Sequence, residues 1–190
     1  NDLGLYFDIS VHAGTLIAVV YYFRNEIFLM SKSLLVTNNF NEDKNLVIQL
    51  IIATIPIVII GFIFRDLISQ RIFSINDIAI SNIIFASILL FAFLNNKGKK
   101  TLINITILGA CFIGLFQCFA LIPGASRSGA AITAGLLIGL SLKDASKFAF
   151  LLAIPTILGA LTLLIFDLNN GNVSFDLFNI SLSLIHISEP

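Results

Sequence analysis

Seven consecutive residues combine the side chains and the backbone freedom that phosphate binding requires. Residues 123–129 read Pro-Gly-Ala-Ser-Arg-Ser-Gly. The guanidinium of Arg127 presents a planar fork of donors that matches phosphate oxygens, while Gly124 and Gly129 permit a tight turn and a close backbone approach. A helix beginning at Ala130 would add N-terminal N–H groups and a positive dipole end. The segment is therefore predicted to form a cradle for a lipid phosphate headgroup.

A purely structural interpretation of the same segment remains open. Pro123 and Gly124 would then kink a membrane helix, the serines would bond freed carbonyls, and Arg127 would extend to the membrane surface. The compact Ser-Arg-Ser cluster between two glycines favours the cradle. Other phosphate or hydrolase motifs are absent from the sequence: no lysine follows Gly129 as a P-loop requires, and there is no GxSxG or HExxH pattern.

The elements that position this segment belong to a membrane protein. Of 190 residues, 57% are hydrophobic and 12% are charged, and the net charge is zero. The mean hydropathy is +0.99, whereas soluble domains carry about 25% charged residues. The balanced charge gives no basic surface for nucleic acid. Cys111 and Cys118 are seven residues apart in one apolar run and are interpreted as packing residues, not as a disulfide or metal site.

Apolar runs divide the chain into helices that approach the roughly 20 residues needed to cross a bilayer. Runs that we expect to span the membrane cover residues 7–23, 46–64, 78–94, 102–122 and 148–166. A polar loop is expected over residues 31–45, and residues 141–147, with Lys143, Asp144 and Lys147, are expected to form a solvated loop. Pro56 and Pro155 are compatible with kinked membrane helices.

The second part of the broken segment, residues 130–140, is too short to cross a bilayer. Irregular backbone at membrane depth survives only where protein or a watery cavity covers it. The fold class predicted is therefore all-α, a polytopic helical membrane protein with a broken, re-entrant helix over residues 123–140. Residues 1–168 would form one membrane domain and residues 169–190 a polar tail.

The lysine and arginine distribution predicts the orientation of the first helices. Loops 24–45 and 95–101 carry six basic residues and loop 65–77 carries two. The basic-rich loops are expected to be cytoplasmic. The topology after residue 122 stays open at this point, because a re-entrant segment returns the chain to the side from which it came.

At the broken segment the sequence resembles the undecaprenyl-diphosphate phosphatase family, also called bacitracin-resistance proteins. Residues 116–129, Phe-Gln-Cys-Phe-Ala-Leu-Ile-Pro-Gly-Ala-Ser-Arg-Ser-Gly, match the family's second signature, and residues 134–141 continue the match. Residues 145–155 fit a third block. Residues 7–19 are similar to the family's early helix, in which His or Gln stands at the position of His12.

The resemblance implies hydrolysis of a C55 polyprenyl diphosphate to the monophosphate and inorganic phosphate, which recycles the lipid carrier for peptidoglycan synthesis and confers bacitracin resistance. It also implies inverted repeats with broken helices, a divalent cation such as Mg²⁺ or Ca²⁺, a site facing outward from the bacterial cytoplasmic membrane, and a homodimer as one assembly. The lipid and the bilayer are the expected partners.

By this resemblance the catalytic residues are Ser126 and Arg127. Arg127 would clamp the diphosphate and stabilise charge in the transition state. Ser126 would be either the nucleophile or a phosphate donor, and these two roles are not separated. The phosphate cradle would comprise four further residues, Gly124, Ser128, Gly129 and Ala130. The family's glutamate-rich motif and its Ser-Thr-Gly-His loop are expected upstream of Asn1, so no metal ligand is assigned within this chain, which is interpreted as a fragment.

Several positions keep two interpretations. Gln117 is a packing amide or a ligand contact, and His12 is a structural or a site-lining histidine. Ala131 stands where the family usually has threonine, so a phosphate-contacting hydroxyl is expected to be lost unless Thr133 reaches the site. The last residues, 183–190, match no expected segment and are either native or foreign sequence.

Three competing functions remain. Acid phosphatase-type lipid phosphatases carry a histidine six positions after the arginine, where this chain has Thr133. A polyprenyl-phosphate translocase would also use a broken helix and an arginine at membrane depth. An inactive paralogue is the third, and Ala131 favours it slightly.

Overall fold

A computed structural model describes residues 14–35, 42–64 and 73–169, and most of these residues are helical. A helix over residues 14–22 comes first. The named elements are α2 (Arg24–Leu35), α3 (Glu42–Ile63), α5 (Ile75–Asn95), the 3-10 turn η1 (Leu102–Asn104), α6 (Ile107–Gln117), the 3-10 turn η2 (Cys118–Leu121), α7 (Arg127–Leu137) and α8 (Leu142–Asn169). Within these ranges the only strand-like contact is an isolated bridge between Lys100 and Leu140. The predicted all-α class is confirmed.

Three of these helices are long and apolar enough to cross a membrane. They comprise α3, α5 and the first 21 residues of α8, Leu142–Thr162. Helices α3 and α8 each continue through an internal proline, Pro56 and Pro155. The spans predicted over residues 46–64, 78–94 and 148–166 are thus confirmed, with earlier starts. The structure contains a helix from Leu142, so the solvated loop predicted over residues 141–147 is wrong beyond its first residue.

Polar side chains at the start of α8 explain why residues 142–147 are helical. Ser141 Oγ accepts the Asp144 N–H at 3.1 Å and lies 2.5 Å from the Asp144 carboxylate. Ser141 therefore caps the first turn of the helix. Lys147, one turn further on, forms an ion pair with Glu26 of α2 at 3.1 Å. These polar residues therefore cap the helix and tie it to α2.

The run over residues 102–122 does not form the single spanning helix that its length predicted. Thr106 caps α6 through its hydroxyl, which accepts the Gly109 N–H at 3.0 Å. Helix α6 then has only 11 residues before the chain tightens into η2. At 1.5 Å per residue such a helix is about 16 Å long, roughly half of the 30 Å hydrocarbon core.

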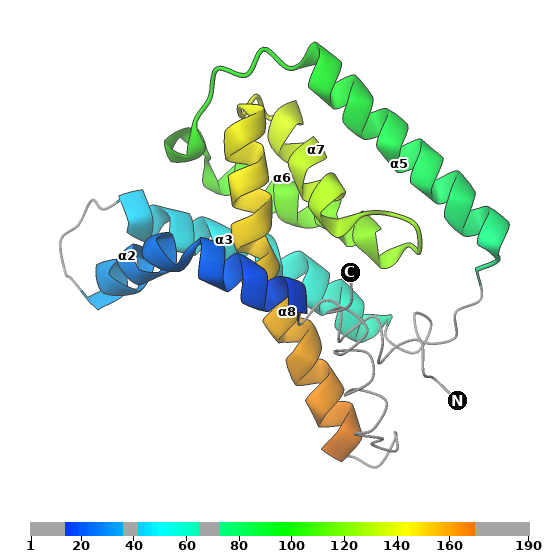
Figure 1. The fold of residues 1–190 in the computed structure, drawn as a ribbon, viewed down its shortest axis with the longest axis horizontal. Helices are drawn as coiled ribbons and strands as arrows, with labels where there is room; N and C mark the ends of the chain where they lie inside the picture. Colours follow the sequence, from blue (N-terminus) through cyan, green and yellow to red (C-terminus); the bar gives the residue numbers. More distant parts are fainter. Residues whose placement is uncertain (1–13, 36–41, 65–72, 170–190) are drawn as a thin grey trace, which may run out of the picture.

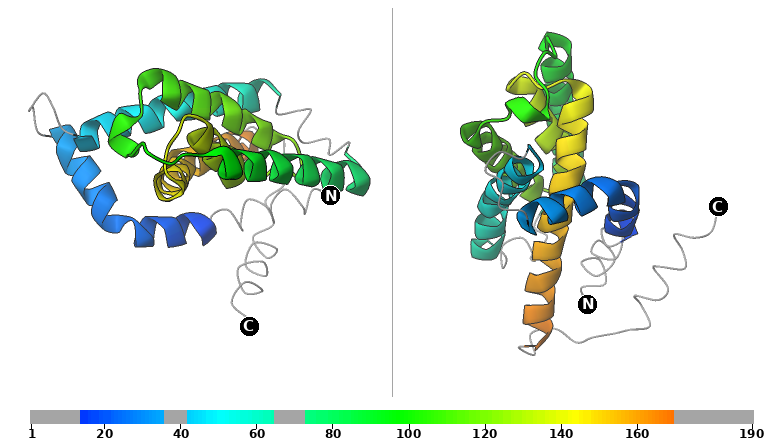
Figure 2. Two further views of the ribbon diagram at one scale, coloured as in Figure 1. Left: turned by 90° about the horizontal axis from the view of Figure 1, so that it is seen from above. Right: turned by 90° about the vertical axis from the view of Figure 1, so that its left-hand side faces the viewer.

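Helices α6 and α7 form an antiparallel hairpin, because Gly109 near the start of α6 lies against the Ile138 side chain after α7. Helix α7 also has 11 residues. The hairpin lies between α5 and α8 in Figure 1, and the two further views in Figure 2 show how α2 turns away from it. We call residues 100–109 and 137–141 its base and residues 122–128 its tip. The chain therefore reverses direction at the tip, and whether this hairpin is re-entrant in the membrane stays a prediction.

Backbone hydrogen bonds close the base. The Lys100 N–H donates to the Gly139 carbonyl at 3.0 Å, and the Ser141 N–H donates to the Lys100 carbonyl at 2.9 Å. Lys100 Nζ caps α7 by donating to the Ile138 carbonyl at 2.9 Å, and Asn96 Nδ2 donates to the Leu140 carbonyl at 2.6 Å. The end of α5, the base and the start of α8 are therefore joined at one end of the molecule.

The first apolar run also differs from its prediction. Residues 14–22 are helical, a turn follows at Phe23, and α2 then continues in a new direction to Leu35. The polar loop predicted from residue 31 therefore begins at least five residues later. Residues 1–13, with His12, and the tail from residue 170 lie outside the described ranges, so the interpretations of His12 and of residues 183–190 stay predictions.

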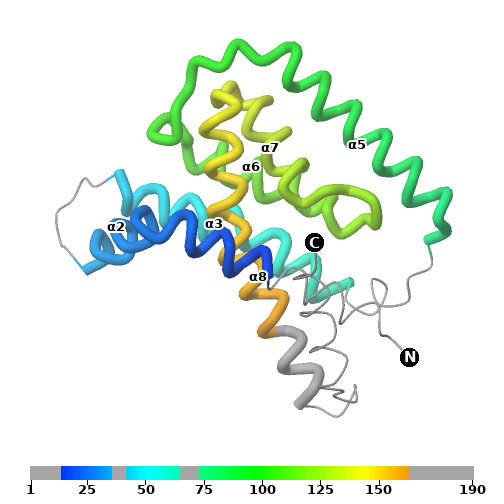
Figure 3. Tube along the Cα trace, in the orientation of Figure 1, coloured from blue at the N-terminus to red at the C-terminus, as the bar shows by residue number. Residues whose placement is uncertain are grey.

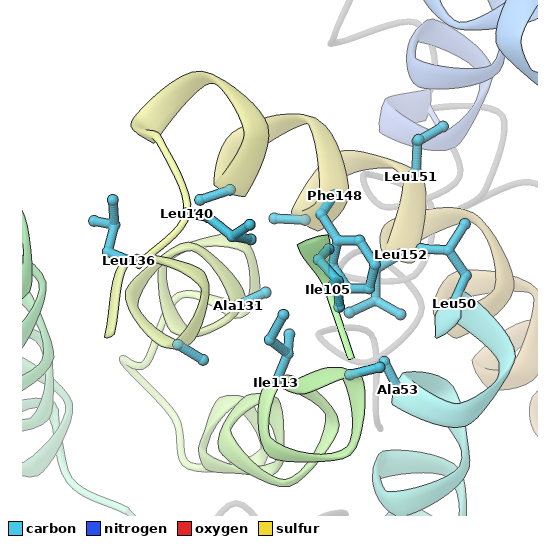
Figure 4. Close-up of a cluster of buried hydrophobic side chains, with 14 of the residues drawn as sticks. Leu50, Ala53, Ile105, Ile113, Ala131, Leu136, Leu140, Phe148, Leu151 and Leu152 are labelled. Carbon is cyan, nitrogen blue, oxygen red and sulfur yellow. The ribbon is translucent and has the colours of Figure 1, made fainter. Parts of the chain in front are cut away.

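A buried apolar cluster holds α3, α6, α7 and α8 together. Figure 4 shows Phe148 and Leu152 of α8 facing Leu50 and Ala53 of α3, with Ile113 of α6 close by. Gly114 follows Ile113 and lies so close to the Ala53 backbone that an added Cβ would sit 2.5 Å from the Ala53 carbonyl oxygen. The absence of a side chain at Gly114 therefore sets the separation of α3 and α6.

The start of α3 and part of α2 lie at the same end of the molecule as the base, although residues 24–35, predicted as part of a loop, form α2. Gln49 near the start of α3 donates to the Ile105 carbonyl at the base at 2.7 Å, and Glu26 pairs with Lys147 beside the base. The Cα trace in Figure 3 lets this arrangement be followed along the chain. That this end faces the cytoplasm stays a prediction.

Candidate active site

The tip opens with a tight turn that requires glycine at its third position. The Ala125 N–H donates to the Ile122 carbonyl at 3.0 Å, with Pro123 and Gly124 at the two central positions. Gly124 has a φ of 94°, and proline followed by a residue with positive φ is the pattern of a type II turn. A Cβ on Gly124 would also overlap the carbonyl oxygen of Ile78 in α5. This β-turn therefore packs directly against the start of α5.

Ser126 follows the turn and caps α7. Its Oγ accepts the Gly129 N–H at 3.1 Å and lies 3.3 Å from Ser128 Oγ. Ser126 is exposed, whereas Ser128 and Arg127 are half-buried. Because the cap uses Ser126 Oγ as an acceptor, its own proton remains available to donate. The two serine hydroxyls therefore lie together at the tip, and the Arg127 side chain starts from the residue between them.

The N-terminus of α7 lies three residues earlier than predicted, at Arg127 rather than Ala130, because Ser126 supplies the cap. The Ala130 N–H consequently donates to the Ser126 carbonyl at 2.8 Å, and Ala130 is buried. The N–H groups of Gly129 and Ala130 are thus already bonded within the helix, contrary to the prediction that they face a ligand. The first-turn N–H groups of Arg127 and Ser128 have no acceptor within the helix and replace them.

Arg127 reaches α8 from the first position of α7. Its Nη1 donates to the Ala153 carbonyl at 3.3 Å, two residues before Pro155. This is a long contact by the standards of charge-assisted hydrogen bonds, which are typically about 2.7–2.9 Å. The guanidinium retains further donors in its fork, so it can bind an anion at the tip while one nitrogen stays oriented by α8.

The structure shows where the side chains of Thr133 and Ala131 lie. Thr133 is buried and its hydroxyl donates to the Gly129 carbonyl at 2.7 Å, so its hydroxyl proton is used within α7. Ala131 is buried in the apolar cluster with Ile113 and Phe148. A hydroxyl at position 131 would enter this cluster. Neither position supplies a phosphate contact in this arrangement.

Gln117 lies at the end of α6 and is 1% exposed. Its Nε2 donates to the Ala53 carbonyl at 2.7 Å. Its Oε1 is buried and has no hydrogen-bond partner. The bond to α3 favours the packing interpretation of Gln117, which fixes the end of α6 that carries the tip.

The residues of the tip do not by themselves fit a divalent cation. Such ions prefer several oxygen ligands, usually including carboxylates, while the tip offers two hydroxyls beside a positive guanidinium. Over the described ranges no three His, Cys, Asp or Glu side chains are grouped as a metal site would require. Cys111 and Cys118 are both free thiols and are half-buried.

Comparison with known proteins assigns the fold that carries this tip to a family. The model of the family described as "Bacitracin resistance protein BacA" matches residues 1–186. The chain belongs to this family. The family resemblance drawn from residues 116–129 is thereby confirmed.

Curated relatives carry a more specific name. The chain is 41% identical over 187 residues to "Undecaprenyl-diphosphatase" of Alcanivorax borkumensis, a match that covers 97% of the chain and 71% of the relative. It is 43% identical over 177 residues to the protein of that name from Alteromonas mediterranea, covering 91% and 66%. "Undecaprenyl-diphosphatase 1" of Pseudoalteromonas translucida is 42% identical over 160 residues, covering 83% and 60%. The chain therefore spans 60–71% of the length of these relatives.

Two contacts of this bacitracin resistance family tip had no signal in the sequence. The Ala153 carbonyl that orients Arg127 and the Ile78 carbonyl beneath Gly124 are backbone atoms. Any residue type supplies the same carbonyl, so only the packing of α5 and α8 against the hairpin identifies them.

Proposed function

We propose that the full protein hydrolyses undecaprenyl diphosphate to the monophosphate and inorganic phosphate, with the hairpin tip holding the diphosphate. One water is consumed, and the bridging P–O bond breaks to leave its oxygen on the lipid phosphate. The observation that carries the proposal is the convergence of Ser126, Arg127 and Ser128 at a helix N-terminus in a chain of this family. The same activity would recycle the lipid for peptidoglycan synthesis and confer bacitracin resistance.

The tip residues would divide the binding of the diphosphate among them. The guanidinium of Arg127 would bind phosphate oxygens through donors not used on Ala153. The free N–H groups at the start of α7 and the Ser128 hydroxyl would add hydrogen bonds that strengthen as charge develops. Ser126 is exposed and serves either as a donor or as the nucleophile, in which case its proton must pass to a base outside the tip.

The location and assembly of the protein form part of the same proposal. The three apolar helices and the family place the chain in a membrane. We infer the bacterial cytoplasmic membrane, with the basic end of the molecule inward and the tip opening outward. A divalent cation held by residues outside this chain, and a homodimer, are further parts that need separate tests.

A polyprenyl-phosphate translocase is the second candidate function. The observation that favours it is a half-length hairpin with an arginine at its tip, which is the arrangement of many transporter sites. A translocase would bind the lipid through the same Arg127 but would release no phosphate. An inactive paralogue would share that outcome.

The test is phosphate release from undecaprenyl diphosphate by the full-length protein, with Mg²⁺, with Ca²⁺ and with a chelator. Arg127→Ala should lower kcat by about 100- to 1000-fold, the effect of removing one preorganised charge-stabilising group. Arg24→Ala is the matched control, because Arg24 is exposed and its Nη1 bonds only the nearby Tyr21 carbonyl. Lipid binding without phosphate release by the parent under every condition would contradict the hydrolase and favour the translocase.

A further inference from the structure

An apolar cavity of about 240 Å³ lies beside the tip. Its walls come from the end of α3, from the residue before the N-cap of α5, and from the segment of the hairpin that leads into the tip. The lining residues are Ile60, Phe64, Phe73, Cys118, Leu121, Ile122 and Pro123. Every one of these side chains is apolar or a thiol, so the cavity suits a hydrocarbon and offers no charge to a phosphate.

The cavity and the tip are continuous through the turn at residues 122–125. Ile122 and Pro123 line the cavity, and Ile122 also accepts the Ala125 N–H that closes the turn. The first and fourth Cα atoms of a β-turn lie within about 7 Å of each other. Ser126 follows directly, so a molecule bound at the tip has the cavity within reach of the first atoms beyond its phosphates.

We propose that this cavity binds the first isoprene units of the lipid whose diphosphate is held at the tip. The inference rests on the proposed function, because it assigns the tail of the same substrate. Sites that enclose a whole drug-sized ligand measure roughly 300–1,000 Å³, so this smaller cavity takes only a segment of the chain. The remaining isoprene units extend from it into the bilayer.

The chemistry of the tail predicts which kinetic constant depends on the cavity. The isoprene units do not change during hydrolysis, so the cavity binds the ground state and the transition state equally. Binding of this uniform kind lowers KM without raising kcat. Filling the cavity should therefore raise KM for a prenyl diphosphate with a much smaller effect on kcat.

Cys118 provides a reporter of occupancy, because it lines the cavity and is a free, half-buried thiol. The experiment uses the full-length protein with every other cysteine replaced by serine, in phosphatidylcholine nanodiscs. The rate of alkylation by N-ethylmaleimide is measured with a non-hydrolysable C15 prenyl methylenediphosphonate, with inorganic diphosphate, and without ligand. At ten times its Kd the prenyl compound should slow alkylation about tenfold, since the free fraction falls as 1/(1 + [L]/Kd).

Inorganic diphosphate should leave the alkylation rate unchanged, because it has no tail. Equal protection by inorganic diphosphate, no protection by the prenyl compound, or a Cys118 that does not react without ligand would each overturn the tail assignment. Phosphate release from undecaprenyl diphosphate, measured on the same protein preparation without the analogue, separates this result from the proposed function. Hydrolysis without protection contradicts only the cavity assignment, and protection without hydrolysis contradicts only the hydrolase.

A pair of neighbouring substitutions gives a second test. Ile60→Phe adds volume to the cavity wall, whereas Ile59→Phe adds it to an exposed neighbour in the same helix that does not line the cavity. Ile60→Phe should raise KM for the prenyl diphosphate at least about tenfold relative to Ile59→Phe, the size expected when a hydrophobic contact of about one or two methylenes is lost. Equal KM values for the two variants would contradict the proposal.

Discussion

The two ends of the hairpin differ in how they are joined to the rest of the protein. At the base, backbone groups of Lys100, Gly139 and Ser141 bond one another, and the side chains of Asn96 and Gln49 add bonds to carbonyls there. At the other end, the bonds to neighbouring helices come from side chains: Gln117, at the end of α6, donates to a carbonyl of α3, and Arg127, in the tip, donates to a carbonyl of α8. A side-chain bond can be exchanged for a bond to a ligand without unfolding the hairpin. The contrast therefore indicates a structural role for the base and leaves the Arg127 side chain available to a ligand.

The first prediction compares equivalent caps at the two ends. Ser126→Asn keeps a side chain that caps α7 but removes the hydroxyl, and should lower phosphate release about 100-fold or more with little change in thermal stability. Thr106→Asn makes the same change at the cap of α6 in the base and should leave phosphate release near the parent value. Comparable losses in the two variants would show that the tip is not chemically distinct.

The second prediction concerns the close contact between Gly114 and Ala53, which sets the separation of α3 and α6. Gly114→Ala places a Cβ within 2.5–2.9 Å of the Ala53 backbone and should destabilise the protein by about 1–3 kcal/mol or more, as overpacking does. Gly61→Ala is the control, because its added Cβ would meet only Leu121 at an ordinary 3.9 Å. The midpoint of thermal unfolding measures both, and a loss in Gly61→Ala equal to that in Gly114→Ala would contradict the explanation.

The third prediction compares two buried glutamines that join α3 to the hairpin. Gln49→Leu removes the donor that bonds the Ile105 carbonyl at the base. It should lower the free energy of unfolding by about 1–3 kcal/mol, the penalty of leaving a buried acceptor without a hydrogen bond. Gln117→Leu also removes an unpaired buried oxygen, and the Ala53 carbonyl keeps its bond within α3. The cost at Gln117 should be less than about 1 kcal/mol in the free energy of unfolding. A reversed order would refute this account of the two bonds.

The smallest expected effect lies at the partly exposed ion pair between Glu26 and Lys147 beside the base. The hydrogen bond from Lys147 lowers the pKa of Glu26 below its usual range. The stability from this pair is therefore present above the unfolded pKa of glutamate and is lost as pH falls through the lower folded pKa. Exposed pairs contribute about 1 kcal/mol at most, so Glu26→Gln should cost no more than this at neutral pH and nothing at acidic pH.

The comparison of Glu26→Gln with the parent is made by thermal unfolding across that pH range. A variant that remains less stable than the parent by the same margin at every pH would show that the ion pair does not account for its effect. Phosphate release should be unchanged at neutral pH, because Glu26 lies at the end of the molecule that carries the base.

Much of the fold follows from the sequence because length and hydropathy decide it. The spans around Pro56 and Pro155 and the break at residues 123–129 were predictable. The run over residues 102–122 was not, because hydropathy records apolar character and ignores the caps that end helices. Thr106 and the tight turn at residues 118–121 divide that run, although Leu, Ile and Phe dominate it throughout.

The tip was predictable in its residue types but not in its bonds. The hydroxyls of Ser126 and Ser128 lie 3.3 Å apart, while the guanidinium of Arg127 contacts the Ala153 carbonyl of α8, a partner that the sequence does not indicate. The predicted start of α7 is wrong because Ser126 caps the helix in addition to carrying a hydroxyl, so Ala130 lacks the free N–H that the sequence predicts for it. Helix capping is a local signal in the sequence, and the N–H groups of Arg127 and Ser128 could have been identified from it.

The bonds that close the base have one more consequence. Lys100 and Ser141 are hydrogen-bonded neighbours, so the two ends of the hairpin meet at one point. The entropy cost of bringing those ends together is therefore met once, at the base. The faces of α6 and α7 between these ends pack against α3 and α8 in the buried cluster, so the hairpin could be exchanged between members of the family only together with the matching residues of those two helices.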